Sequence, residues 1–143
     1  MGNKTWVYDP HSGGVKIPKA VQERTRSRII AYAEKNFSGK FVRIDVRFRG
    51  ALCYVDAFTE PYVSEEFDPN ELGETREEYI ERLRSFPTHL CRLRYFGDED
   101  RWTMAFFTYS NEKYEPSVFN NGSFHGTPEE AFETSSVETV NNK

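Results

Sequence analysis

The chain has 143 residues and a formal net charge of −4, with 37% apolar, 29% charged and 15% aromatic residues. This length fits one domain, and the high aromatic content excludes a disordered chain, because disordered chains are poor in large rings. No run approaches the ~20 apolar residues needed to span a bilayer, and no apolar signal segment follows the first residues. We therefore expect a cytoplasmic protein with one domain over residues 1–137 and a frayed tail over residues 138–143.

Charge is divided unevenly along the chain. Residues 1–50 contain 11 Lys or Arg and 4 Asp or Glu, a net charge of +7, whereas residues 51–143 contain 8 and 19, a net charge of −11. No Gly/Ser linker, Pro-rich spacer or low-complexity tract accompanies the change. The sequence therefore predicts a single domain with a strongly dipolar charge distribution.

The first part of the chain predicts a helix and then a hairpin. Apolar residues recur about every four positions after a proline, which favours a helix over residues 18–36. Apolar and charged residues then alternate, which indicates a strand over residues 42–49 with one oily and one charged face. A glycine allows a tight reversal into a largely apolar partner strand over residues 51–58. The buried face of the first strand is expected to contain Val42, Ile44, Val46 and Phe48.

The second part repeats this order of elements. Residues 59–73 form an acidic connector that is long for a compact domain, and such loops are often functional or mobile. A capping-box pattern at Thr75 begins a second helix, which Pro87 ends. A second hairpin is predicted over residues 89–109, followed by a short capped helix over residues 128–134.

These elements predict an α+β fold with two main helices, a short C-terminal helix and an antiparallel sheet built from two β-hairpins. If residues 5–8 add a central strand, the order resembles a ferredoxin-like arrangement. The sequence does not determine the strand order. We expect Leu83, Met104 and Phe106 in the core.

Catalytic and metal-binding patterns are scarce. The three histidines lack the spacing of a metal site, and two cysteines are too few for a zinc site or a disulfide framework. His89 and Cys91 are two positions apart in one predicted strand, so alternation places them on one face. With Cys53 across from them and Asp56 or Asp45 to orient the imidazole, they would form a nucleophilic set, and a cysteine-dependent enzyme is therefore one alternative. We expect no catalytic residue, no cofactor and no metal.

Basic residues suggest a second alternative. Arginines populate the first helix and the charged face of the first strand, and Arg92 and Arg94 repeat the pattern in the second hairpin. A basic strand face with nearby rings can bind single-stranded nucleic acid, although a pI of 5.5 weakens this interpretation. Pairing with the protein's own carboxylates is the competing explanation. The candidate nucleic-acid-binding residues are Arg24, Arg28, Arg43, Arg47 and Arg49.

The leading hypothesis is a non-enzymatic binding or accessory protein that acts through protein–protein contact or self-association. Residues 109–126 are irregular in pattern yet rich in aromatic residues, which either pack over the core or form a recognition surface. The candidate partner-surface residues are Tyr114, Phe119, Phe124 and His125. Neither a membrane nor a metal is expected among the partners.

Overall fold

The computed structural model describes residues 12–141, and these residues adopt the predicted α+β class with an antiparallel sheet. The predicted strand at residues 5–8 lies outside them. The elements in chain order are α1 (Lys19–Asn36), β1 (Arg43–Arg49), β2 (Leu52–Phe58), the 3-10 helix η1 (Pro69–Leu72), α2 (Arg76–Arg84), β3 (Thr88–Tyr95), β4 (Trp102–Thr108), β5 (Lys113–Ser117) and α3 (Pro128–Asn141).

The five strands are hydrogen-bonded in chain order from β1 to β5, and each strand is antiparallel to its neighbour. The described sheet is therefore a continuous meander and does not have the ferredoxin-like order. Its five strands are one more than the four strands of two hairpins. The extra strand, β5, lies in the segment that the sequence indicated as irregular. Pro116 weakens its strand pattern but is tolerated there, because β5 is at the sheet edge.

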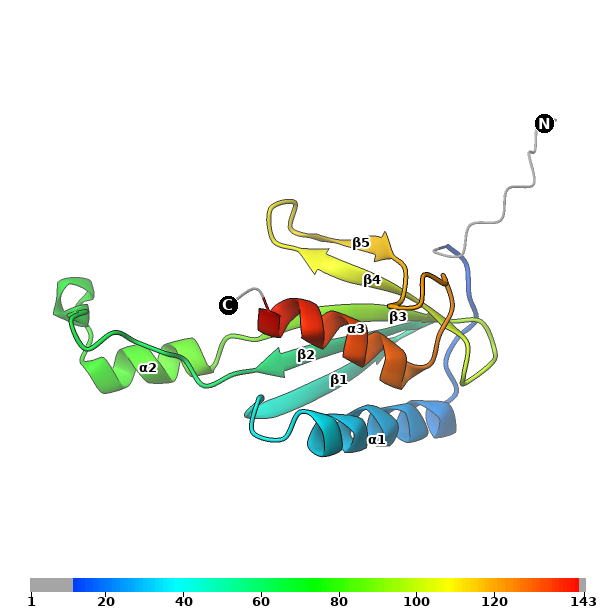
Figure 1. Ribbon diagram of the computed structural model, residues 1–143, viewed down its shortest axis with the longest axis horizontal. Coiled ribbons are helices and arrows are strands. Elements are labelled where there is room, and N and C mark those ends of the chain that lie inside the picture. The colour runs from blue at the N-terminus through cyan, green and yellow to red at the C-terminus, as the bar shows by residue number, and fades with distance from the viewer. Residues whose placement is uncertain (1–11, 142–143) are drawn as a thin grey trace.

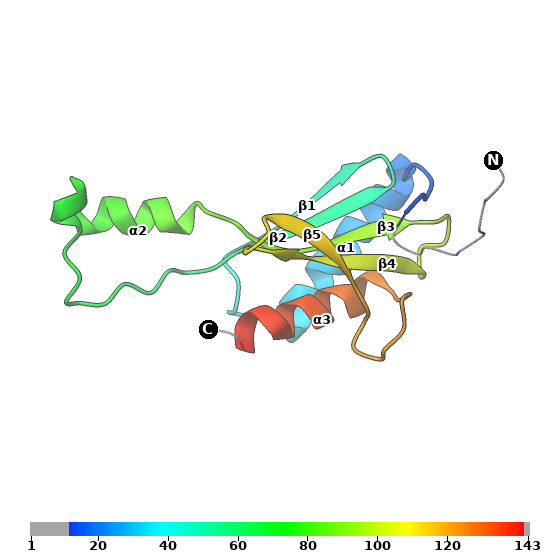
Figure 2. The same cartoon turned by 90° about the horizontal axis from the view of Figure 1, so that it is seen from above.

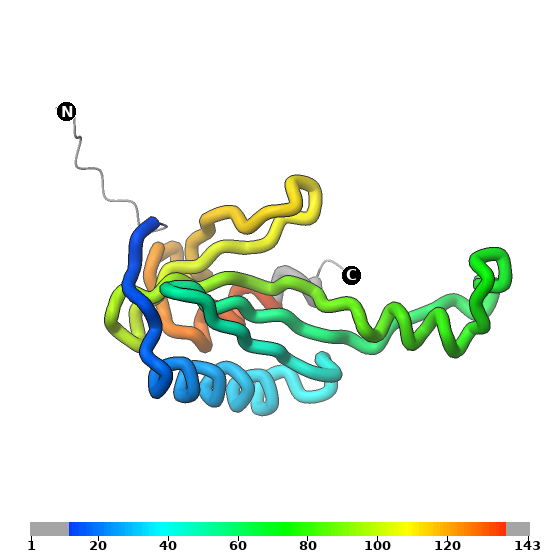
Figure 3. Tube along the Cα trace, turned by 180° about the vertical axis from the view of Figure 1, so that it is seen from behind, coloured from blue at the N-terminus to red at the C-terminus, as the bar shows by residue number. Residues whose placement is uncertain are grey.

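Two helices cover one face of the sheet. Figures 1 and 2 show α1 and α3 on the same side of the strands, and the core lies between these layers. Figure 3 shows the opposite face, which no helix of the described chain covers. Residues 12–18 cross the strand ends instead, where Val15 N–H donates to Tyr95 O at 2.9 Å and Ile17 N–H donates to Gly50 O at 3.0 Å.

The predicted core is confirmed in part. Val46 and Met104 are buried, whereas Ile44, Phe48 and Phe106 are partly buried against the core. Val42 is 55% exposed, contrary to expectation, because β1 begins one residue later and the residue lies outside the alternating strand. Leu83 is only partly buried, because α2 lies away from the sheet.

Residues 59–87, here called the arm, project from the body between β2 and β3 (Figure 1). The predicted capping box is present at the start of α2, where Thr75 Oγ1 accepts from Glu78 N–H at 3.1 Å. The Arg76 guanidinium donates to the carbonyls of Val63, Ser64 and Phe67, the shortest contact being 2.7 Å. The long acidic connector is thus organised by its own polar contacts.

The C-terminal helix is longer than the sequence indicated. α3 runs to Asn141, whereas the sequence predicts a helix that ends at residue 134. No helix within the described residues is both long enough and apolar enough to cross a membrane.

Candidate functional site

The sheet face opposite α1 and α3, here called the open face, gathers charged and aromatic side chains from all five strands. The register alternates core-facing residues with these outward-facing ones, so the pairs Arg47–Tyr54, Tyr54–Arg92 and Phe107–Tyr114 are direct cross-strand neighbours. The open face is defined by Arg43, Asp45, Arg47, Arg49, Tyr54, Asp56, Phe58, His89, Arg92, Arg94, Phe107 and Tyr114.

Asp56 is the electrostatic centre of the open face. Its side chain is 6% exposed; Oδ2 accepts from Arg47 Nη2 at 3.0 Å and Oδ1 contacts His89 Nδ1 at 2.8 Å. A carboxylate oxygen can only accept, so the Nδ1 proton of His89 is donated to Asp56 and the Nε2 atom remains for other partners. The two partners compensate the cost of burying this carboxylate.

A register shift in β2–β3 creates the Asp56–His89 contact. Val55 pairs with Cys91, and Asp56 then pairs with His89 rather than with Leu90. This bulge moves His89 onto the open face, whereas Cys91 points to the helix layer beside Ser135. The predicted shared face of His89 and Cys91 is therefore wrong, because simple alternation does not hold across a bulge.

Guanidinium groups lie over the rings of the open face. Arg47 lies 5.2 Å from the centroid of Tyr54, and Arg92 lies 5.4 Å from that of Tyr114. The two tyrosine rings meet edge to face at 5.5 Å, and His89 packs against Phe107 at 4.8 Å. Burial raises the pKa of Tyr114, so its hydroxyl stays neutral and can donate a hydrogen bond.

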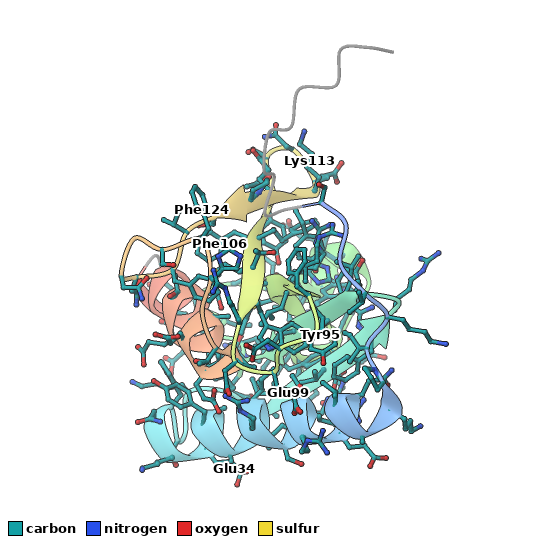
Figure 4. The ribbon with its side chains drawn as sticks, turned by 90° about the vertical axis from the view of Figure 1, so that its right-hand side faces the viewer. Glu34, Tyr95, Glu99, Phe106, Lys113 and Phe124 are labelled. Carbon is teal, nitrogen blue, oxygen red and sulfur yellow. The ribbon has the colours of Figure 1, made fainter. Side chains whose placement is uncertain are left out.

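The five candidate nucleic-acid residues fall on two surfaces. Arg43, Arg47 and Arg49 lie on the open face, as their strand alternation predicted. The remaining two, on α1, join the helix layer: Arg24 pairs with Glu99 at 2.9 Å, and Arg28 pairs with Asp100 at 2.9 Å and Glu129 at 2.7 Å. Figure 4 shows Glu99 directly above α1. The arginines of β1 therefore share the open face with Arg92 and Arg94 of β3 and not with the arginines of α1.

The four candidate partner residues are also separated. Tyr114 belongs to the open face, but Phe119 is 2% exposed and fills the space beside Gly126, where an added Cβ would lie 2.6 Å from its ring. Phe124 is 50% exposed and lies at the upper left of Figure 4, above α3. His125 packs against Phe96 at 6.4 Å. These residues do not form one surface.

The cysteines lie on the other side of the sheet from the Asp56–His89 pair. Both Cys53 and Cys91 are fully buried. Burial raises the pKa of Cys53 well above its ordinary value and that of Cys91 to about 12. Neither sulfur is a thiolate at neutral pH, so the arrangement does not favour cysteine chemistry.

Sequence reasoning missed two rings of the open face, Tyr54, which lies beside Arg47, and Phe107, which packs against His89; it named Tyr114 but grouped it with residues of another surface. Tyr54 and Phe107 lie in strands that are largely apolar on both faces, so their pattern did not separate core from surface. Among the described residues, no three His, Cys, Asp or Glu side chains gather as a metal site requires. Comparison with protein-family models, with curated proteins and with solved structures finds no match to this chain.

Proposed function

We propose that this protein is a non-enzymatic binding protein whose open face takes an acidic segment of a protein partner. The observation that carries the proposal is the layer of arginine and tyrosine side chains on a sheet face that no helix within residues 12–141 covers. Tyrosine and arginine are enriched at protein interfaces, and arginine binds carboxylates through paired hydrogen bonds.

The charge of the open face supports an acidic partner. The face carries five Arg and two Asp, a net charge of +3, although the whole chain has a net charge of −4. Arg43 and Arg47 are already paired with Asp45 and Asp56. Arg92 lies over a tyrosine ring and forms no ion pair with another described residue, so its donors are available to a partner's carboxylates.

Single-stranded nucleic acid is the second candidate partner. The observation that favours it is again the stacking of guanidinium groups on rings, because such layers bind phosphates and bases together. The net charge of the chain counts against it, since nucleic-acid affinity depends on phosphate neutralisation.

A reducing, cytoplasmic setting belongs to the proposal. Its support is the pair of unbonded cysteines in the core. Secreted proteins of the oxidising compartments instead tend to carry disulfides.

The experiment that tests the proposed function is an NMR titration of isotope-labelled protein with three probes. These are a peptide of alternating Glu and Tyr, a matched peptide of Lys and Tyr, and a thymidine oligonucleotide. We expect the acidic peptide alone to shift the amides of Tyr54, Arg92 and Tyr114, because it complements both the charge and the rings of the open face.

Matched variants locate the binding. Arg49→Glu with Arg92→Glu should abolish the shifts, whereas Lys35→Glu with Lys40→Glu, at exposed positions in and after α1, should leave them unchanged. Shifts caused by the oligonucleotide and not by the acidic peptide would transfer the proposal to nucleic acid. No shift with any probe would reject a binding role for the open face.

A further inference from the structure

The arm carries a charge opposite to that of the open face. Residues 59–87 contain nine Asp or Glu and three Arg, a net charge of −6. Glu71 and Glu77 are exposed and form no ion pair or hydrogen bond of their side chains with another described residue. The arm is therefore an acidic segment with unused carboxylates, the chemistry that the open face fits.

The arm also exposes apolar side chains that its own fold does not bury. Tyr62 is 88% exposed, Leu72 59% and Phe86 57%, and none of the nine residues of α2 is buried. An isolated helix shorter than ~12–15 residues is marginal in water, and α2 is held only by contacts within the arm: its cap, surface ion pairs, the Arg76 hydrogen bonds and the packing of Phe67 on Tyr79 at 5.0 Å. A surface that covers the arm would stabilise it.

We propose that the open face of one copy binds the arm of a second copy, and that the exchange is reciprocal. The inference rests on the proposed function and names its partner. The acidic arm, with a net charge of −6, meets a face with a net charge of +3, and the exposed rings and leucine of the arm meet the tyrosine–arginine layer.

The dimensions allow this contact. A nine-residue helix is ~14 Å long, and four inter-strand spacings make a five-stranded sheet ~19 Å wide, so α2 with η1 spans the central strands. Figure 3 shows that the arm extends beyond the strand ends and does not lie over its own open face. A two-fold axis between two such molecules places the arm of each copy on the open face of the other. The two contacts then form one self-complementary interface.

The test is a pair of charge-reversal variants studied by size-exclusion chromatography with light scattering. The face variant carries Arg49→Glu and Arg92→Glu, and the arm variant carries Glu71→Arg and Glu77→Arg. The face variant changes the charge of the open face from +3 to −1, and the arm variant changes that of the arm from −6 to −2. Each variant alone weakens the charge complementarity of both contacts, so we expect the dimer that the wild type forms at low salt to weaken by at least about a hundredfold.

Mixing the two variants should restore the dimer. In the mixed pair, the unchanged arm of the face variant meets the unchanged open face of the arm variant, and the arginines introduced on the other arm meet the glutamates introduced on the other face. This rescue also shows that both variants are folded. Lys35→Glu and Glu23→Arg on α1 are the control variants, and each should dimerise as the wild type does.

Each other outcome overturns the inference. A wild type that is monomeric at all concentrations excludes the reciprocal exchange, and so does a dimer that both variants keep. It is also excluded if both variants lose the dimer, show native circular dichroism and do not form a dimer when they are mixed. If the monomeric protein still binds the Glu/Tyr peptide in the NMR titration, the proposed function stands, and only the identification of a second copy as the partner is wrong. If the peptide also fails to bind, both are wrong.

Discussion

At the scale of single residues, the arrangement around Asp56 decides what the open face can do. Asp56 is the direct cross-strand partner of Asp45, and two carboxylates so placed repel each other. Arg47 and His89 pair with the carboxylate of Asp56, and Arg43 pairs with that of Asp45. These pairs leave the open face basic in spite of two acidic side chains.

The two aspartates provide a matched comparison. Asp56→Asn removes a charge that is 6% exposed and bridges two strands, so we expect the free energy of unfolding to fall by roughly 1.5–3 kcal/mol. Asp45→Asn breaks a pair whose side chains are 41% and 62% exposed, and its cost should stay below about 1 kcal/mol. Urea unfolding at pH 7 measures both. Equal costs would show that the Asp56 contacts do not order the open face.

The contact between Asp56 and His89 marks what residue-level reasoning could not predict. Alternation along a strand correctly placed Arg43 and Arg47 on one face. The same rule placed His89 with Cys91, but the bulge between β2 and β3 puts these residues on opposite faces. A bulge is a non-local pairing feature, and nothing in the residues before Cys91 announces it.

At the scale of elements, one ion pair joins the two helices of the covered face. Arg28 of α1 donates to both carboxylate oxygens of Glu129 in α3, at 2.8 and 2.7 Å. Partial burial raises the pKa of Glu129, but the hydrogen bonds and charge of Arg28 outweigh burial, so this pKa lies below its ordinary value of 4.5. The pair therefore favours the folded state in which Glu129 is ionised.

The pH dependence follows from this direction. A carboxyl whose pKa is lower in the folded state adds stability above its unfolded pKa, and this stability is lost as the pH falls through the folded pKa. Glu129→Gln should thus cost about 1–2 kcal/mol at pH 7, and its difference from the wild type should shrink below pH 4.5. Urea unfolding at pH 7 and at pH 3 measures this, with Glu23→Gln as the control. A cost that is the same at both pH values contradicts the account.

Most elements could be predicted because their signals are local. The capping box at Thr75 and the alternation of β1 each specify an element within a few residues. β5 was missed because Lys113–Ser117 is short, polar and contains a proline, and only its place at the sheet edge makes it a strand. Strand order and the position of the arm depend on contacts between distant segments, which no local pattern encodes.

At the scale of the whole molecule, the fold converts a charge asymmetry along the chain into two separate surfaces. The sequence predicted a basic first part and an acidic remainder, but it did not predict that the acidic connector would project away from the body (Figure 1). The fold places Arg24 and Arg28 of α1 in ion pairs with Glu99 of the β3–β4 turn and Glu129 of α3. The arm and the open face remain as an acidic and a basic surface on one molecule.

The contact between the arm of one copy and the open face of another can be measured directly with a spin label on the arm, detected at the open face of the second copy. Leu72→Cys introduces a thiol at a position that is 59% exposed, whereas the native Cys53 and Cys91 are fully buried and stay unlabelled. Spin-labelled protein is mixed with isotope-labelled protein of native sequence, so that only contacts between copies broaden the NMR signals. We expect broadening of the amides of Tyr54, Arg92 and Tyr114, and recovery of these signals when ascorbate reduces the label. Signals from the open face that stay sharp at low salt would contradict the proposed contact.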